Sequence, residues 1–197
     1  LFLIFHPFKG FWDLKHEKRG SIRSAFLILI ITIAAFTYQS VGTGYIFNPR
    51  QSGYVNVIGQ VVSVSVPLIL WCVANWCLTT LFEGEGSMKD IFIAACYSLA
   101  PLPLLMVPSV ILSNVLAASE GQIITLLVDI AFVWMGLLLF LGMMVTHDYS
   151  MLKNVITSIG TIVGMAFIMF LAILFSSLMT KIVGFISGII VEITYRM

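Results

Sequence analysis

Charged side chains are scarce in this sequence, at 10% of its 197 residues, whereas soluble domains carry about 25%. Hydrophobic residues account for 60% of the chain, which is more than a water-exposed fold needs. The formal net charge of +1 creates no strong field that would attract nucleic acid. The composition therefore excludes an ordinary soluble domain and a nucleic-acid-binding protein, and it indicates an integral membrane protein.

Recognisable catalytic and metal-binding motifs are also missing. The sequence contains no P-loop, no dinucleotide-binding fingerprint, no HExxH pair and no nucleophile paired with a base. Its cysteines, Cys72, Cys77 and Cys96, lie in apolar runs without the spacing of a zinc or redox site, which indicates small core residues. We therefore predict a protein that is not an enzyme and binds no cofactor.

Long apolar runs are abundant. A membrane-spanning helix needs about 20 mostly apolar residues, because the hydrocarbon layer is roughly 30 Å thick and each residue rises about 1.5 Å. The sequence predicts an all-α integral membrane protein with five such helices, near residues 24–40, 57–82, 90–117, 122–146 and from 155 onward.

The third of these runs contains Pro101, Pro103 and Pro108. Each proline removes a backbone donor and clashes with the preceding turn, so we predict that this helix is broken near its middle. Such a break is either a structural kink or part of a cavity wall.

The end of the fifth run has a different pattern. Lys181, Gly184, Gly188 and Glu192 recur every three or four residues among apolar neighbours, which makes one narrow polar stripe. Residues 182–197 either extend the fifth span or lie in the membrane interface, and the sequence does not decide between the two.

Basic residues predict the orientation, since cytoplasmic loops carry an excess of Lys and Arg. With the N-terminus in the cytoplasm, that side holds Lys9, Lys15, Lys18, Arg19, Arg23, Lys89 and Lys153. The outer side then holds only Arg50, Lys181 and Arg196. We therefore predict a cytoplasmic N-terminus and an outward C-terminus.

Asp129 is the one charged residue well inside a predicted span. An ionised carboxylate without a partner is costly in a membrane, so it should pair or become neutral. In the predicted topology only Lys181 and Arg50 lie on the same side as possible basic partners. Three interpretations remain open: a structural ion pair or hydrogen bond, part of a transport or proton path, or a position close to the interface.

Two glycine pairs one helical turn apart, Gly160 with Gly164 and Gly184 with Gly188, lie in the fifth run. Such pairs let two helix backbones approach closely in a membrane. The pattern is compatible with packing inside the monomer, with a subunit interface, or with chance.

Acidic and imidazole groups gather in the two predicted cytoplasmic loops: Glu83, Glu85 and Asp90 in one, His147 and Asp148 in the other. The set lacks the two-His or Cys pattern that would support a metal site. We instead expect the acidic loop to pair with the basic segment 15–23. Ser87 and Asp90 form a capping-box variant, and Gly84 and Gly86 are expected to permit the tight turn.

The N-terminal segment mixes aromatic and basic residues. Phe8, Phe11, Trp12 and Lys15 have helical spacing, which suits a short helix on an anionic inner leaflet. We divide the chain into an interfacial segment at 1–23 and a five-span domain at 24–197. Because the chain starts in an apolar run, residues 1–5 are expected to be the tail of an upstream helix or the start of an interfacial segment.

Several of these motifs together resemble the Yip (Ypt-interacting protein) domain in its bacterial form. The resemblance is carried by His6-Pro7-Phe8 with Gly10-Phe11, by Asn75-Trp76-Cys77-Leu78-Thr79-Thr80-Leu81, by Glu83-Gly84-Glu85-Gly86-Ser87 with Lys89-Asp90, by Tyr97-Ser98-Leu99-Ala100-Pro101, by His147-Asp148-Tyr149-Ser150 and by Glu192. It extends over nearly the whole chain, and the block around 75–90 is its most specific part.

The resemblance implies five spans, a cytoplasmic N-terminus and no catalytic residues. Eukaryotic relatives contact Rab-type GTPases and one another, an activity that a bacterial member in a plasma membrane would not share. We therefore expect a non-catalytic scaffold or accessory subunit that binds other membrane proteins, with an ABC-type permease or a second copy of the chain as partner classes. The candidate interaction residues are Asn75, Glu83, Gly84, Glu85, Gly86, Asp90, Asp129 and His147. The alternative is a small transporter or channel component with a path near Asp129 and Pro101.

Overall fold

A computed structural model describes residues 2–17, 20–48 and 56–196, and these residues form helices joined by short connections, without β-strands. Five helical segments are long and apolar enough to cross a membrane: Ile22–Gly42, Val57–Phe82, Met88–Ser113, Ala118–His147 and Met151–Arg196. The protein is therefore an integral multi-pass membrane protein, as its composition predicts.

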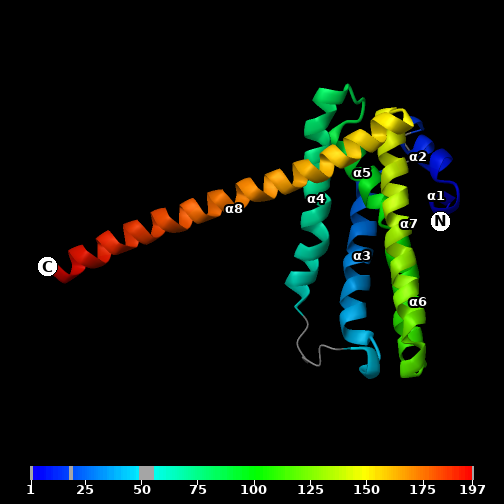
Figure 1. Ribbon diagram of the computed structural model, residues 1–197, viewed down its shortest axis with the longest axis horizontal. Helices are drawn as coiled ribbons and strands as arrows, with labels where there is room; N and C mark the ends of the chain where they lie inside the picture. The colour runs from blue at the N-terminus through cyan, green and yellow to red at the C-terminus, as the bar shows by residue number, and fades with distance from the viewer. Residues whose placement is uncertain (1, 18–19, 49–55, 197) are drawn as a thin grey trace.

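The helices follow one another with few interruptions. In chain order they are α1 (Phe2–Phe5), α2 (Pro7–His16), α3 (Ile22–Gly42), η1 (Tyr45–Phe47), α4 (Val57–Phe82), α5 (Met88–Ser98), α6 (Pro101–Ser113), η2 (Ala118–Glu120), α7 (Gly121–His147) and α8 (Met151–Arg196). In Figure 1, α3, α4, α6 and α7 stand side by side as a bundle. We call the end of the bundle that holds the 83–87 and 148–150 connections the polar end.

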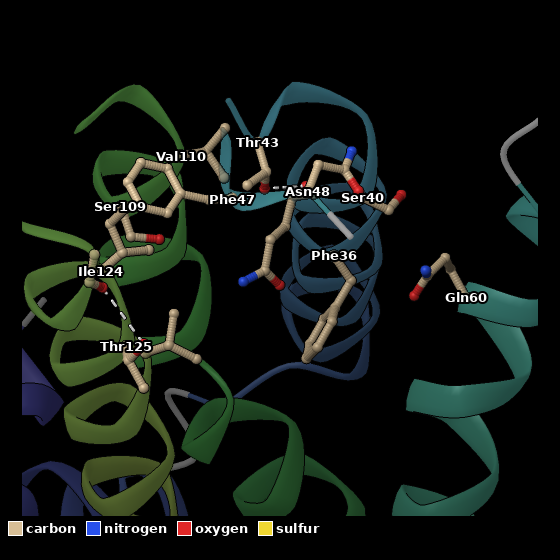
Figure 2. A pocket seen from close by; sticks show the side chains of 13 residues that line it. Phe36, Ser40, Thr43, Phe47, Asn48, Gln60, Ser109, Val110, Ile124 and Thr125 are labelled. Atoms are coloured by element: carbon tan, nitrogen blue, oxygen red, sulfur yellow. Dashed lines mark hydrogen bonds between the residues drawn. The ribbon is translucent and has the colours of Figure 1, made fainter. Parts of the chain in front are cut away.

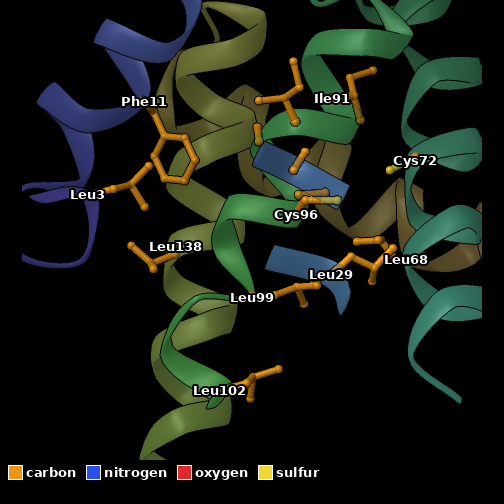
Figure 3. Packing of buried hydrophobic residues seen from close by; sticks show 14 of the residues in the cluster. Leu3, Phe11, Leu29, Leu68, Cys72, Ile91, Cys96, Leu99, Leu102 and Leu138 are labelled. Atoms are coloured by element: carbon orange, nitrogen blue, oxygen red, sulfur yellow. The ribbon is translucent and has the colours of Figure 1, made fainter. Parts of the chain in front are cut away.

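The core lies around α5, which together with α6 forms the most enclosed of the five membrane-spanning stretches. Ile91 and Cys96 of α5 are fully buried, and α3, α4 and α7 surround them. Figure 3 shows the cluster, to which these helices contribute Leu29, Leu68, Cys72 and Leu138, and the N-terminal helices Leu3 and Phe11. The N-terminal segment is therefore packed onto the bundle.

The junction between α5 and α6 lies at Leu99 and Ala100, directly before Pro101. Leu99 keeps a right-handed helical conformation; its N–H bonds to the Cys96 carbonyl, and the N–H of Ala100 bonds to the Tyr97 carbonyl. The two segments together form one of the five membrane-spanning stretches, Met88–Ser113.

Helix α2 attaches to the bundle through one aromatic residue. Phe11 is 2% exposed, and a Cβ added at Gly142 of α7 would lie 2.9 Å from its ring. Phe8 and Trp12 of the same helix are about half exposed. Phe11 thus packs into the bundle, whereas Phe8 and Trp12 lie on the outer face of α2.

Helix α8 is an uninterrupted helix of 46 residues, about 69 Å long at the usual rise. Its first part crosses α4, and it then leaves the bundle, so that its C-terminal end lies clear of the other helices (Figure 1). Every described side chain from residue 171 onward is exposed. Residues 182–196 thus continue the fifth helix without a bend.

Candidate functional site

The polar end contains a buried hydrogen bond between two helices. His147, the last residue of α7, is 1% exposed, and Asn75 of α4 is 3% exposed. The His147 Nε2 atom lies 2.7 Å from the Asn75 Oδ1 atom. Two of the sequence-predicted candidate residues, 72 positions apart, are therefore in direct contact.

The second ring nitrogen of His147 is also occupied. The backbone N–H of Gly86, in the connection between α4 and α5, donates to His147 Nδ1 over 3.3 Å. Because Nδ1 accepts this bond, the imidazole proton resides on Nε2 and is donated to Asn75. Neither nitrogen is left to bind a metal or a substrate in this arrangement.

The hydrogen bonds continue from α4 into α8. The Asn75 side-chain amide donates to the Thr161 hydroxyl over 3.1 Å, and that hydroxyl donates to the Thr157 carbonyl over 2.8 Å. Thr161 is fully buried. The chain of bonds has one consistent direction and connects the 83–87 connection, α7, α4 and α8, so it fixes these four segments relative to one another.

Gly84 and Gly86 are required by close packing and not by their backbone conformation. A Cβ at Gly84 would lie 2.3 Å from the Tyr149 hydroxyl oxygen, and one at Gly86 would lie 2.8 Å from the His147 ring. Both glycines have negative φ angles, and the left-handed residue in this connection is Glu83. The prediction that the glycines permit the turn was therefore wrong: Glu83 makes the turn, and the glycines make room for α7.

Helices α4 and α7 end in the same way. Glu83 has φ 50° and Asp148 has φ 56°, and both stand at the C-caps of their helices. The N–H of Gly84 bonds to the Thr79 carbonyl, and that of Tyr149 bonds to the Met144 carbonyl. These caps satisfy carbonyls that would otherwise face the membrane interface unpaired.

The Tyr149 ring covers one face of the His147 imidazole. The two rings stack with centroids 5.0 Å apart, and the Lys153 ammonium lies 4.9 Å from the tyrosine ring centroid. Burial raises the pKa of the Tyr149 phenol, so it stays neutral at physiological pH. The neutral Tyr149 ring therefore packs against both the His147 imidazole and the Lys153 ammonium.

The acidic connection pairs with α2, as the sequence predicts. Lys15 Nζ lies 3.1 Å from a Glu85 carboxylate oxygen, and the Lys15 side chain is largely covered. The capping box is confirmed, because Ser87 and Asp90 bond to each other's backbone N–H groups at the start of α5. Lys18 and Arg19 of the basic segment lie outside the described residues.

Asp129 does not belong to this group. It is exposed on α7, about 27 Å along the helix from His147, and it lines a surface pocket with Phe47 and Gln122. It has no ion-pair partner among the described residues. Lys181 stands on the outlying part of α8, and Arg50, the other expected partner, lies outside the described residues.

The two glycine pairs lie in different surroundings. A Cβ at Gly160 would lie 3.2 Å from Leu78 of α4, and one at Gly164 would lie 3.4 Å from Ala74. By contrast, Gly184 and Gly188 have nothing within 4 Å of such a Cβ. The first pair thus packs inside the monomer, and the second is open on the outlying part of α8.

A polar cavity of about 580 Å³ lies at the opposite end of the bundle, between α3, α6 and α7. Figure 2 shows side chains of Thr43, Ser109 and Thr125 around it, with Phe36 and Phe47 among them. Its lining contains amides and hydroxyls but no charged side chain. Neither Asp129 nor Pro101 contributes to it.

The hydrogen bonds of the polar end tie its helices together. Its imidazole has both nitrogens engaged, and no group of three His, Cys, Asp or Glu residues within the described ranges could hold a metal. Thr161 was missed among the candidates, although a hydroxyl between Gly160 and Gly164 in an apolar run signals a polar contact at a close helix crossing.

The fold and this site define a polytopic helical membrane protein with a hydrogen-bonded polar end. Residues 1–174 match the model of the Yip1 domain family, and the chain belongs to that family. No curated protein and no solved structure matches the chain significantly.

Proposed function

We propose that this protein is a non-catalytic membrane scaffold or accessory subunit, whose 83–87 connection binds other membrane proteins. The observation that carries the proposal is that His147 and Tyr149 pack against the glycines of this connection, and His147 also accepts a hydrogen bond from it. Glu83 and Glu85 of the same connection remain exposed. A short surface segment fixed in one conformation loses little entropy on binding, which favours a docking role.

The same proposal includes an orientation and a location. We propose that the polar end faces the cytoplasm, that the C-terminus lies outside and that the membrane is a bacterial plasma membrane; the excess of basic residues at the polar end supports this orientation. Residues 1–23 are the interfacial segment, and 24–197 are the five-span domain. The interruption at Leu99 and Ala100 results from Pro101 and Pro103, whose missing N–H groups cannot continue the helix of α5.

The partner class that fits best is another multi-pass membrane protein, such as the permease of an ABC-type transporter. Family analogy suggests this class, and the open face of α8 at Gly184 and Gly188 adds a surface on which a second helix can pack closely. A second copy of the chain could use the same face.

Quantitative co-purification from mild detergent tests the docking role. The variant Glu83→Lys, which leaves the Lys15–Glu85 ion pair intact, should lose a defined set of co-purifying membrane proteins while keeping the unfolding midpoint. Glu120→Lys, at the opposite end of the bundle, is the matched control and should retain that set. Identical sets from all three proteins would contradict a docking role for the connection.

A small transporter or channel component is the second candidate, favoured by the polar cavity of about 580 Å³ at the opposite end. A solute that used this cavity would pass Ser109 and Thr125 and then approach Asp129 or the Pro101 junction. Solute flux into proteoliposomes that Thr125→Phe abolishes, without loss of stability, would favour this function over the scaffold, because Thr125 is an exposed lining residue.

A further inference from the structure

A second cavity, of about 380 Å³, lies at the polar end between α2, α5 and α7. Its walls combine apolar side chains with two lysines and one aspartate. The lining residues that matter here are Phe11, Lys15, Lys89, Asp90, Ile93 and Thr146. Basic and apolar side chains in one cavity, beside the ends of helices, make an environment that suits a lipid head group.

Thr146 is the observation that marks this cavity as a site. Ten other threonines, at positions 32, 37, 43, 79, 80, 125, 157, 161, 180 and 194, donate their hydroxyls to a carbonyl of their own helix. Thr146 is 4% exposed and lines the cavity, and its hydroxyl makes no hydrogen bond with the described residues. The hydroxyl is not among the fully enclosed unpaired atoms, so it is open to the cavity and free to bond a ligand there.

The charges around the cavity favour an anion. Lys15 uses one of its three donors on Glu85, which leaves two for a ligand, and Lys89 is exposed beside it. The Asp90 carboxylate accepts from the N–H and hydroxyl of Ser87, so its charge is partly compensated. The lining residues therefore carry a net charge of one positive unit, which Glu85 offsets from outside the lining, so the spare lysine donors are what favour an anion.

We infer that this cavity binds the phosphate of an anionic phospholipid. Lys15 and Lys89 would hold the phosphate oxygens, the Thr146 hydroxyl would donate to one of them, and Phe11 and Ile93 would contact the glycerol and the first acyl carbons. The inference goes beyond the docking role of the 83–87 connection and does not depend on it.

Titration of the delipidated full-length chain with phosphatidylglycerol tests the inference. Native mass spectrometry should show one tightly held lipid per chain, and the unfolding midpoint should rise with lipid concentration. Lys89→Gln removes one charge-assisted contact, so the lipid dissociation constant should increase about tenfold. Thr146→Val keeps the shape and charge and should increase it about three- to tenfold.

The control is Lys153→Gln, a basic residue of the polar end outside the cavity, which should leave the dissociation constant unchanged. Inorganic phosphate and phosphatidylcholine at matched concentrations should give no comparable stabilisation. Equal weakening by Lys153→Gln would overturn the inference in favour of diffuse surface charge. Full affinity in Thr146→Val, or equal stabilisation by inorganic phosphate, would also overturn it. Because Lys89 is exposed, its variant is expected to fold even if Thr146→Val does not.

Discussion

The imidazole of His147 donates to the side-chain carbonyl of Asn75 over 2.7 Å, in the interior of the polar end. This one bond connects the end of α7 with the C-terminal third of α4, helices that otherwise share few direct contacts. It also sets the direction of the bonds on both sides of it, from Gly86 to Thr161. Four predictions follow from the surroundings of this contact and from the helix packing.

Removing either member of the His147–Asn75 pair should destabilise the protein. His147→Ala leaves the Asn75 carbonyl and the Gly86 N–H without partners, and each buried unpaired group costs about 1–3 kcal/mol. In a double-mutant cycle with Asn75→Ala, the two effects should be less than additive by about 1–3 kcal/mol. Unfolding in detergent measures the cycle, and strict additivity would show that the bond contributes nothing.

Gly84→Ala should destabilise the polar end, because its new methyl group would overlap the Tyr149 hydroxyl and the His147 ring. Overpacking of this kind costs about 1–3 kcal/mol. Adding Tyr149→Phe removes the nearest overlapping atom and should restore part of the loss. Gly136→Ala, where nothing lies within 4 Å of the new methyl group, is the control and should be neutral.

Phe11→Ala should separate the N-terminal helices from the bundle. The buried ring fills the space over Gly142, and its loss should cost about 3–5 kcal/mol. Phe8→Ala, on the exposed face of the same helix, should cost less than about 1 kcal/mol. Limited proteolysis of the N-terminal segment reports the separation directly, and equal sensitivity of the two variants would refute the anchor role of Phe11.

Gly160→Leu should push α8 away from α4, since even a Cβ at this position would lie 3.2 Å from Leu78. The variant should lower the unfolding midpoint and weaken the Asn75–Thr161 bond one residue further along. Gly184→Leu, in open surroundings, should leave the midpoint of the isolated chain unchanged. A disulfide between cysteines placed at Leu78 and Gly160 would measure the helix separation independently.

The sequence predicts the long helices well, because polar residues mark the ends of each apolar run. The predicted span at 57–82 coincides with α4 (Val57–Phe82), and that at 122–146 lies one residue inside each end of α7 (Gly121–His147). The course of α8 was not predictable. A helix that is apolar on all sides packs equally well against lipid and protein, so its sequence contains no signal for direction.

The candidate site could be predicted only in part. Alternation of the spans places His147 and the 83–87 connection at the same end of the bundle, and both were singled out on that basis. Their contact with Asn75 and Thr161 depends on the rotation and depth of α4 and α8, which one sequence does not specify. Asp129 was singled out by its charge alone, and charge does not tell which side of a helix faces the bundle.

The chain of hydrogen bonds from Gly86 to Thr161 has a consequence for synthesis. The ribosome adds His147 72 residues after Asn75, and it adds Thr161 86 residues after Asn75. At about 5–20 residues per second, α4 waits roughly 4–17 s in the membrane before its amide has both partners. During that interval the nascent protein carries a polar group in lipid that the finished protein conceals. In a chain that stops before Thr161, the Asn75 amide has no Thr161 hydroxyl to donate to. The Asn75 side chain therefore distinguishes incomplete molecules from complete ones.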